Sequence, residues 1–478
     1  MRRLEKKRIS GGPEAPVAPG EEHTPRSSES SKSVEEVVAD ITDLQQARKA
    51  PQELSGGTPL WKHLGPGLIT GAADDDPSGI GTYSVAGAQF GYGLLWLVPY
   101  CIPLMIAVQE MCGRIGAVTG KGLAAILKEH YPRWILWGAV GLLFVANTIN
   151  VYADFNVMAA SAKMLFHGPF FLWLTLLTVV TLGLQVFVPY RSYVRFLKWM
   201  CLALLAYVVT DFWPGVHNNW GLIARNLFMP HWSKDPAFIL TVVGFLGTTI
   251  SPYLFFWQAG ETVEEEIAEG KAVAPGQRQA ACSDAEMRQV RADTIIGMVA
   301  SQAVTFFIIL CTKSQLFDHH LNDINTAQDA ARALIPLGAA AYWLFTLGIL
   351  GTGLLAIPTL AGSAAYGLAE TFGWRYGLYR RFQRARGFYA TIAAVILIGF
   401  GLNFVKSISP IKGLLYSAVL NGLVAPPLIV LLLMVCNNAK IVGERRNGLW
   451  SNLLGWLAVI LMTIAAALMI WGMATGKM

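Results

Sequence analysis

From Trp61 to its last residues, the chain alternates between long apolar segments and shorter polar connections. A helix needs about 20 apolar residues to cross the hydrocarbon core of a bilayer. Segments that meet this length are centred near residues 76, 101, 146, 179, 204, 251, 301, 353, 394, 423 and 461. The pattern therefore predicts an all-α polytopic membrane protein with its transmembrane domain over residues 59–478.

Residues 1–58 have a different composition, rich in Ser, Glu, Pro and Lys and almost without aromatic residues. Such a segment buries too little apolar surface to offset the entropy lost on ordering. We expect residues 1–58 to form a disordered cytoplasmic tail. The first apolar run begins only after Leu64, so the sequence predicts no secretory signal.

Basic residues between the spans orient the chain, because cytoplasmic loops carry an excess of Lys and Arg. If the N-terminus is cytoplasmic, nineteen Lys and Arg lie in cytoplasmic connections and eight on the opposite side. The cytoplasmic connections are then 113–133, 189–198, 260–291, 371–386 and 437–449. We expect a protein of the inner (plasma) membrane with its C-terminus outside. The net charge of +6 then reflects topology, and no nucleic-acid partner is predicted.

Two spans are interrupted near their centres. The first reads GPGLITGAADDDPSGIGTYSVAGAQFG, in which Asp74, Asp75 and Asp76 precede a proline. One charged side chain at the centre of an inserting helix costs roughly 2.5–3.5 kcal/mol. The sixth span reads VVGFLGTTISPYLFFWQAGE, and its Pro252 removes a backbone donor. A proline kink alone would explain the sixth interruption, but a kink requires no carboxylates.

Broken helices are tolerated in membranes where the freed backbone groups face protein or a water-filled cavity, and their carbonyls then become cation ligands. The two interruptions are five spans apart, so a second five-helix unit enters the membrane from the opposite side. We therefore predict two inverted five-helix repeats over about 62–213 and 237–436. The binding site lies at their interface, and an eleventh helix at about 450–472 is added outside them.

The two interruptions resemble those of the Nramp divalent-metal transporters, which have Asp-Pro-Gly-Asn in the first span and Met-Pro-His in the sixth. This chain has Asp76-Pro77-Ser78-Gly79 and Ser251-Pro252-Tyr253 at the same places. The resemblance covers nearly everything after residue 60. It implies a leucine-transporter-like fold and alternating access for a divalent cation. It also implies metal ligation by the Asp76 carboxylate and by carbonyls near Ala73 and Thr248.

Several family positions carry different residues here. Ser251 replaces the methionine, Gly79 replaces the asparagine, and Ala418 stands where a glutamine of the tenth span is usual, with Asn421 one turn further. Oxygen ligands remain, and these suit Mg²⁺, Ca²⁺ and Mn²⁺. The leading hypothesis is a carrier that imports Mg²⁺, or Mn²⁺ in second place, as in the Nramp-related magnesium transporters. The candidate ligands are Asp76, Ala73, Gly79, Thr248, Ser251 and Asn421.

Proton coupling depends on titratable groups beyond the metal site. Asp154 in the third span matches an acidic residue of the family, but Val157, Tyr253 and Gln258 stand where its other titratable groups are usual. We therefore expect uptake driven by the membrane potential and the metal gradient, without acidification.

The role of the remaining intramembrane acids stays open at this point. Asp154 is either proton-related or a structural acid bonded to Asn150 or Tyr152. Asp74 and Asp75 are further candidates for proton binding, since crowded carboxylates raise one another's pKa.

The alternatives differ in the cargo or in the class of protein. They are a proton-coupled Mn²⁺ or Fe²⁺ symporter, an organic-solute or Na⁺-coupled carrier of the same fold, a channel, and an intramembrane aspartyl protease. This chain lacks the Gly-x-Gly-Asp context of an intramembrane aspartyl protease. We therefore expect no enzymatic activity and no cofactor besides the transported cation. The predicted partners are that cation and the lipid bilayer, with the chain as a monomer.

An acidic run follows the sixth span. It is expected to be a solvated helix end rather than a site that gathers cations, and it comprises Glu261, Glu264, Glu265, Glu266 and Glu269.

Overall fold

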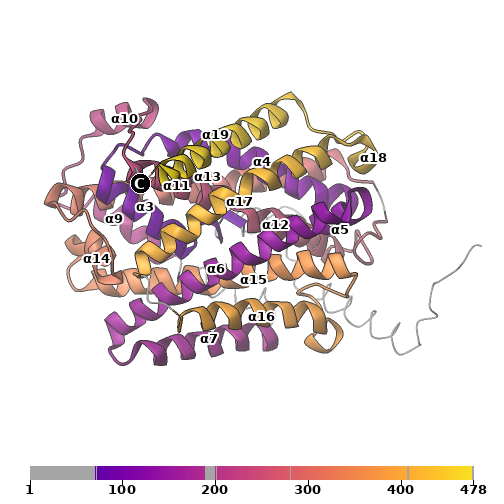
Figure 1. Cartoon of the computed structure of the whole chain (residues 1–478), viewed down its shortest axis with the longest axis horizontal. Coiled ribbons are helices and arrows are strands. Elements are labelled where there is room, and N and C mark those ends of the chain that lie inside the picture. Colours follow the sequence, from indigo (N-terminus) through magenta and orange to yellow (C-terminus); the bar gives the residue numbers. More distant parts are fainter. Residues whose placement is uncertain are drawn as a thin grey trace, which may run out of the picture. The chain divides into compact units, whose positions relative to one another are not determined.

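The structure is a computed structural model, and it describes residues 70–71, 73–188, 200, 202–279, 281–405 and 409–475. The predicted tail, residues 1–58, lies outside these ranges. The described residues form helices and no strand, apart from a single bridge between Ala272 and Arg278. The all-α prediction is therefore confirmed (Figure 1).

Helices occur at all of the predicted spans. The first five spans are helical residues 70–71 and 73–74 with α3 (Pro77–Phe90), α4 (Leu97–Thr119), α6 (Arg133–Phe166), α7 (Phe170–Phe187), and η2 (Leu202–Leu204) with α9 (Leu205–Asp211). The last six are α11 (Pro236–Thr249) with α12 (Pro252–Ala268), α13 (Asp284–Gln315), α15 (Ala340–Phe372), α16 (Arg386–Leu402), α17 (Pro410–Asn437) and α19 (Leu449–Ala474).

Shorter helices lie in the connections. They are α5 (Leu123–His130), α10 (Trp220–Phe228), η3 (Phe317–His319), α14 (Ala327–Ala331), η4 (Arg332–Leu337), η5 (Phe382–Arg384) and α18 (Ala439–Val442).

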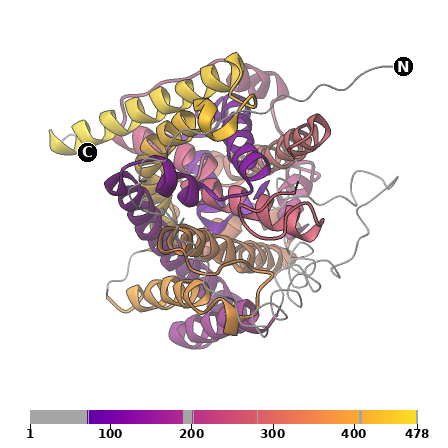
Figure 2. The ribbon, with the colours of Figure 1, turned by 90° about the vertical axis from the view of Figure 1, so that its right-hand side faces the viewer.

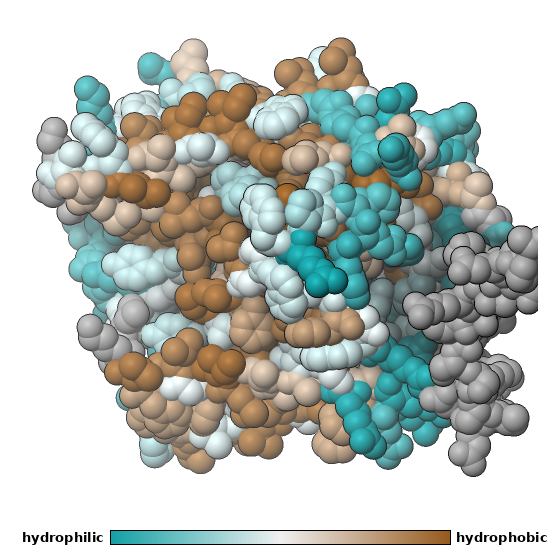
Figure 3. Space-filling view, turned by 45° about the vertical axis from the view of Figure 1, so that its right-hand side comes forward, coloured by the Kyte–Doolittle hydropathy of each residue, from teal (hydrophilic) through white to brown (hydrophobic). Residues whose placement is uncertain are grey.

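Eight of the helical segments in the described ranges are long and apolar enough to cross a membrane, with α11 and α12 taken together as one. Helices Leu202–Asp211 and Arg386–Leu402 are apolar but shorter. Apolar residues cover much of the face in Figure 3, while hydrophilic residues gather toward its right-hand side. On exposed helices such as α7 and α19, Val179 and Ile464 are 62% and 52% exposed, as lipid-facing side chains would be.

Packing between the helices shows a reciprocal pattern. The second span packs on the sixth through α4 and α12, and the seventh packs on the first through α13 and α3. The third and eighth spans, α6 and α15, pack on each other. Exchanging each span with the one five places further leaves these three contacts unchanged, which is the relation expected of two repeats. Helices α7 and α16 pack against α6 and α15, as Figures 1 and 2 show.

Connections predicted to share one side of the membrane meet at one end of the helices. Gly276 donates its amide to the Gly120 carbonyl at 2.6 Å, Arg445 pairs with Asp284 at 2.5 Å, and the Leu378 amide bonds to Glu264 at 2.6 Å. These contacts join 113–133, 260–291, 371–386 and 437–449 in space. The fifth connection, 189–198, lies outside the described residues.

Candidate metal centre

The break in the first span is organised around Asp76. This residue has extended backbone angles and is the N-cap of α3, followed by Pro77 in the first helical position. Both residue types favour these positions, because a carboxylate accepts from free amides and proline lacks one. Asp76 Oδ1 accepts from the Gly79 amide at 2.7 Å and from the Ser78 hydroxyl at 2.6 Å. A buried carboxylate is thereby held at the positive end of a helix.

The sixth span breaks at Ile250–Ser251, between α11 and α12. Ser251 precedes Pro252 and donates to the carbonyls of Gly247 at 3.0 Å and Thr248 at 2.6 Å. These carbonyls belong to the last turn of α11, where helical partners run out. The serine therefore closes the first half of the broken helix instead of capping the second.

The two breaks lie against each other, as predicted. The Tyr253 hydroxyl donates to the Ala73 carbonyl at 2.8 Å and lies 3.4 Å from Asp76 Oδ2. Ser78 and Thr248 bring their hydroxyl oxygens to 3.2 Å. The carbonyls of Ala73 and Thr248, both predicted ligands, thus already accept hydrogen bonds from hydroxyls of the sixth span. A cation that used these carbonyls would have to replace those hydroxyl contacts.

The other two predicted ligands are placed differently. The Gly79 amide donates to Asp76, so Gly79 supports the carboxylate through a group that cannot bind a cation. The Asn421 side-chain oxygen accepts from Asn150 at 2.9 Å, which joins α17 to α6. Within the described ranges, no hydrogen bond joins Asn421 to Asp76. No three His, Cys, Asp or Glu side chains of these residues converge as ligands. A metal at Asp76 would therefore rely on one carboxylate, carbonyls, hydroxyls and water.

Asp154 on α6 is fully buried, and neither of its carboxylate oxygens has a hydrogen-bond partner among the residues that the structure describes. The expected bonds to Asn150 or Tyr152 are not formed. Asp154 interacts electrostatically with Asp76 across the site. Because an unpaired buried carboxylate is costly when ionised, this position favours a proton or a nearby cation.

The third and fourth intramembrane acids face another helix. The Ser301 hydroxyl of α13 lies 2.7 Å from Asp74 Oδ2 and 3.0 Å from Asp75 Oδ1. Asp74 and Asp75 therefore lie against the seventh span, while Asp76 faces the sixth. Sequence reasoning missed Ser301, since a serine inside an apolar span has no distinguishing signal. Ser78 could have been predicted from the sequence, because it belongs to the Asp-Pro-Ser-Gly motif.

Comparison with known proteins supplies the family. The family model described as "Natural resistance-associated macrophage protein-like", or Nramp, matches residues 67–472. The chain belongs to the Nramp family. Among curated relatives, a "Divalent metal cation transporter MntH" of Bacillus subtilis (strain 168) is 24% identical over 447 residues, 88% of this chain and 96% of the relative. An MntH of Burkholderia ambifaria is 27% identical over 324 residues, 64% of this chain and 68% of that protein.

Solved structures extend the likeness to the fold. A manganese transporter of Eremococcus coleocola aligns with a TM-score of 0.69 and 18% identity, over 88% of this Nramp chain and 89% of that one. Mhp1, a nucleobase-cation-symport-1 family transporter, aligns with a TM-score of 0.51 and 13% identity, over 86% and 92% of the two chains. The leucine-transporter-like fold predicted from the sequence is confirmed. The Nramp chain is a multi-pass membrane protein.

The acidic run after the sixth span is less solvated than expected. Glu261, Glu264 and Glu266 are buried, so the prediction of a solvated helix end is wrong for these three residues. Glu264 accepts from the Tyr366 hydroxyl on α15 and from the Leu378 amide. The Glu264 carboxylate is therefore satisfied by one donor from α15 and one from the connection that follows this helix, as expected of a buried polar group.

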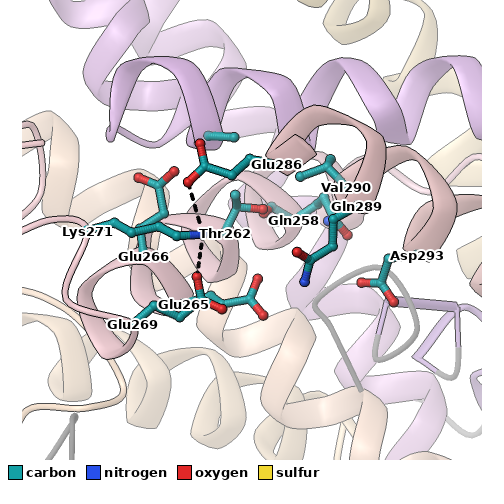
Figure 4. Close-up of a pocket in the computed structure, with 11 residues that line it drawn as sticks. Gln258, Thr262, Glu265, Glu266, Glu269, Lys271, Glu286, Gln289, Val290 and Asp293 are labelled. Carbon is teal, nitrogen blue, oxygen red and sulfur yellow. Dashed lines mark hydrogen bonds and ion pairs between the residues drawn. The ribbon is translucent and has the colours of Figure 1, made fainter. Parts of the chain in front are cut away.

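Part of the same run borders a small pocket between α12, α13 and α4 (Figure 4). Lys271 there pairs with Glu269 at 2.6 Å and with Glu286 at 3.0 Å. Burial opposes the charge on Lys271, but the hydrogen bonds to these two carboxylates outweigh it and raise the pKa of the lysine. The pocket reaches Gln258, which accepts a hydrogen bond from Thr70 of the first span. The pocket therefore extends from the connection after α12 to Gln258, within the second half of the broken sixth span.

Proposed function

We propose that this Nramp protein imports a divalent metal cation by alternating access, and that Mn²⁺ is its cargo. The observation that carries the proposal is the position of Asp76. This buried carboxylate caps a half-helix and lies 3.4 Å from the Tyr253 hydroxyl of the second broken span. Hard oxygen groups around one carboxylate suit Mn²⁺ as a ligand set.

The names of the relatives support Mn²⁺ among the cargoes that an oxygen ligand set suits equally. The relatives named above are divalent metal cation and manganese transporters. The leading hypothesis from the sequence was Mg²⁺, and these comparisons give it no support. They favour the alternative, a Mn²⁺ symporter. We retain Asp76, with the carbonyls of Ala73 and Thr248, as the proposed ligands.

Proton coupling is favoured by one observation, the unbonded carboxylate of Asp154, which interacts electrostatically with Asp76. An acid in this position can release its proton when a divalent cation arrives, because the two positive charges repel each other. Coupling is not required by energy alone. Two charges moving inward gain roughly 4.6 kcal/mol per 100 mV, at about 2.3 kcal/mol per charge.

The test is ion flux into proteoliposomes that contain the full chain, with Mn²⁺, Mg²⁺ and Cd²⁺ offered separately and internal pH recorded. Mn²⁺ uptake should be abolished in Asp76→Asn and kept in Asp211→Asn, a buried acid outside the breaks. If Asp76→Asn transports Mn²⁺ at the normal rate, the proposed site is wrong. If Mg²⁺ enters and Mn²⁺ does not, the proposed cargo is wrong.

We also propose that the end of the molecule where the four connections meet is cytoplasmic, because it carries the excess of basic residues. A C-terminal reporter that becomes active only outside the cell would test this orientation. The reporter should be active, and a reporter that stays inactive on the folded protein would reverse the orientation.

A further inference from the structure

The break in the first span presents carboxylates in two directions. Asp76 is directed to the sixth span, whereas Asp74 and Asp75 meet Ser301 of α13. All three acids are buried, with 0%, 6% and 1% exposure for Asp74, Asp75 and Asp76. The metal centre proposed above uses only Asp76, so the other two carboxylates have no function assigned.

Ser301 cannot donate a hydrogen bond to Asp74 and Asp75 at the same time. A serine hydroxyl has a single hydrogen to donate. Its oxygen nevertheless lies 2.7 Å from Asp74 and 3.0 Å from Asp75. When that hydrogen points to one carboxylate, the oxygen lone pairs face the other one. Two ionised carboxylates around one hydroxyl repel each other, so this arrangement is stable only with a proton or a cation among these oxygens.

An independent observation points to the same place. Asp74 Oδ1 is buried and has no hydrogen-bond partner within the described ranges. Among those residues, the charges that interact with Asp74 and Asp75 are those of the neighbouring acids and not those of any Lys, Arg or His. Buried charges are normally paired or bound to a metal, because their desolvation is otherwise not compensated. The free oxygen therefore requires a positive partner, either a proton or a metal ion.

We propose that Asp74, Asp75 and Ser301 bind a second divalent cation, on the side of the break that faces the seventh span. Two carboxylates supply two negative charges, which match a divalent ion, and every donor is a hard oxygen. The hydroxyls of Tyr83 and Thr249 lie 3.2 Å apart, and Tyr83 interacts electrostatically with both carboxylates.

The second site rests on the proposed function only in the choice of ion. The acids of the two sites are adjacent in the chain, so two bound divalent ions repel each other. We therefore expect the second ion to bind more weakly than the first, and each ion to promote departure of the other. A second site would explain why the break carries three aspartates, whereas the first site uses only one.

The experiment measures how many Mn²⁺ ions the purified full chain binds, from the loss of the electron paramagnetic resonance signal of free Mn²⁺ during titration. Two ions per chain are expected for the unmodified protein. Asp75→Asn and Asp76→Asn should each bind one. Ser301→Ala should keep two, with the second bound about tenfold more weakly. The controls are Asp211→Asn, a buried acid elsewhere, and Ser314→Ala, a buried serine further along α13; both should bind two.

The outcomes separate this proposal from the proposed function. One ion per chain that is lost in Asp76→Asn and kept in Asp75→Asn overturns the second site and leaves the transport site intact. One ion that is lost in both variants shows a single shared site and also overturns the proposal. Two ions that both persist in Asp76→Asn contradict the proposed transport site instead. If Asp75→Asn does not fold, Ser301→Ala keeps both carboxylates, and an unchanged second affinity in that variant overturns the proposal.

Discussion

Replacing Gly247 with alanine tests whether the broken sixth span depends on close contact with the tenth. Gly247 lies on α11 one residue before Thr248, and it packs on α17. A Cβ at this position would lie 2.1 Å from the Ala418 carbonyl oxygen and 2.3 Å from the Gly422 amide nitrogen. All of these atoms are backbone, so no side chain can rotate away to make room. The helices themselves would have to separate.

The size of the effect follows from these distances. Ordinary contacts of a Cβ begin near 3.4 Å, so α11 and α17 would move apart by about 1.3 Å. Overpacking costs typically 1–3 kcal/mol, and backbone contacts place this case at about 3 kcal/mol. The better helix propensity of alanine offsets about 1 kcal/mol. We expect a net destabilisation of about 2 kcal/mol, roughly thirtyfold in the folding equilibrium.

Function should suffer more than stability. Thr248 adjoins Gly247, and a binding site tolerates displacements of only about 0.5 Å. We expect Gly247→Ala to lower the apparent melting temperature in detergent and to abolish Mn²⁺ uptake per folded molecule. The matched control is Gly413→Ala on α17, where an added Cβ meets nothing within 4 Å. This control should gain up to about 1 kcal/mol and transport normally. Equal melting temperatures and equal uptake in the two variants would refute the reasoning.

Three further predictions concern the site and its support. Tyr253→Phe removes the hydroxyl that donates to the Ala73 carbonyl. Mn²⁺ then no longer has to displace this hydrogen bond, which is worth about 1 kcal/mol, so calorimetry should show Mn²⁺ binding about fivefold more tightly. Weaker binding would show that the hydroxyl is itself a ligand. Ser251→Met adds a soft thioether and should increase competition of Cd²⁺ with Mn²⁺ uptake, whereas unchanged competition would place Ser251 away from the ion. Asp154→Asn should abolish any Mn²⁺-dependent acidification inside proteoliposomes while Mn²⁺ still binds; acidification that persists would exclude this residue as the proton carrier.

The sequence by itself determined the spans and the breaks. An apolar segment of about 20 residues in a bilayer forms a helix, because a helix satisfies every backbone hydrogen bond within the segment. Asp76-Pro77 and Ser251-Pro252 interrupt two helices for local reasons: both prolines lack an amide, and the Asp76 side chain also caps the helix that follows it. Local chemistry of this kind is readable from a few neighbouring residues. The five-span separation of the breaks then indicated the inverted repeats.

Only the tertiary structure decided which partner each polar group meets. Asn421 faces Asn150, Glu264 faces Tyr366, and Ser301 faces the first two aspartates of the triplet, over sequence separations of 271, 102 and 227 residues. The helical period fixes the direction of a side chain from its own axis, but not which helix stands there. That choice depends on how eleven spans pack together, which no local pattern contains. For this reason the motif could predict Asp76 as a metal ligand, whereas the role of Asp74 and Asp75 depends on a serine that only packing brings to them.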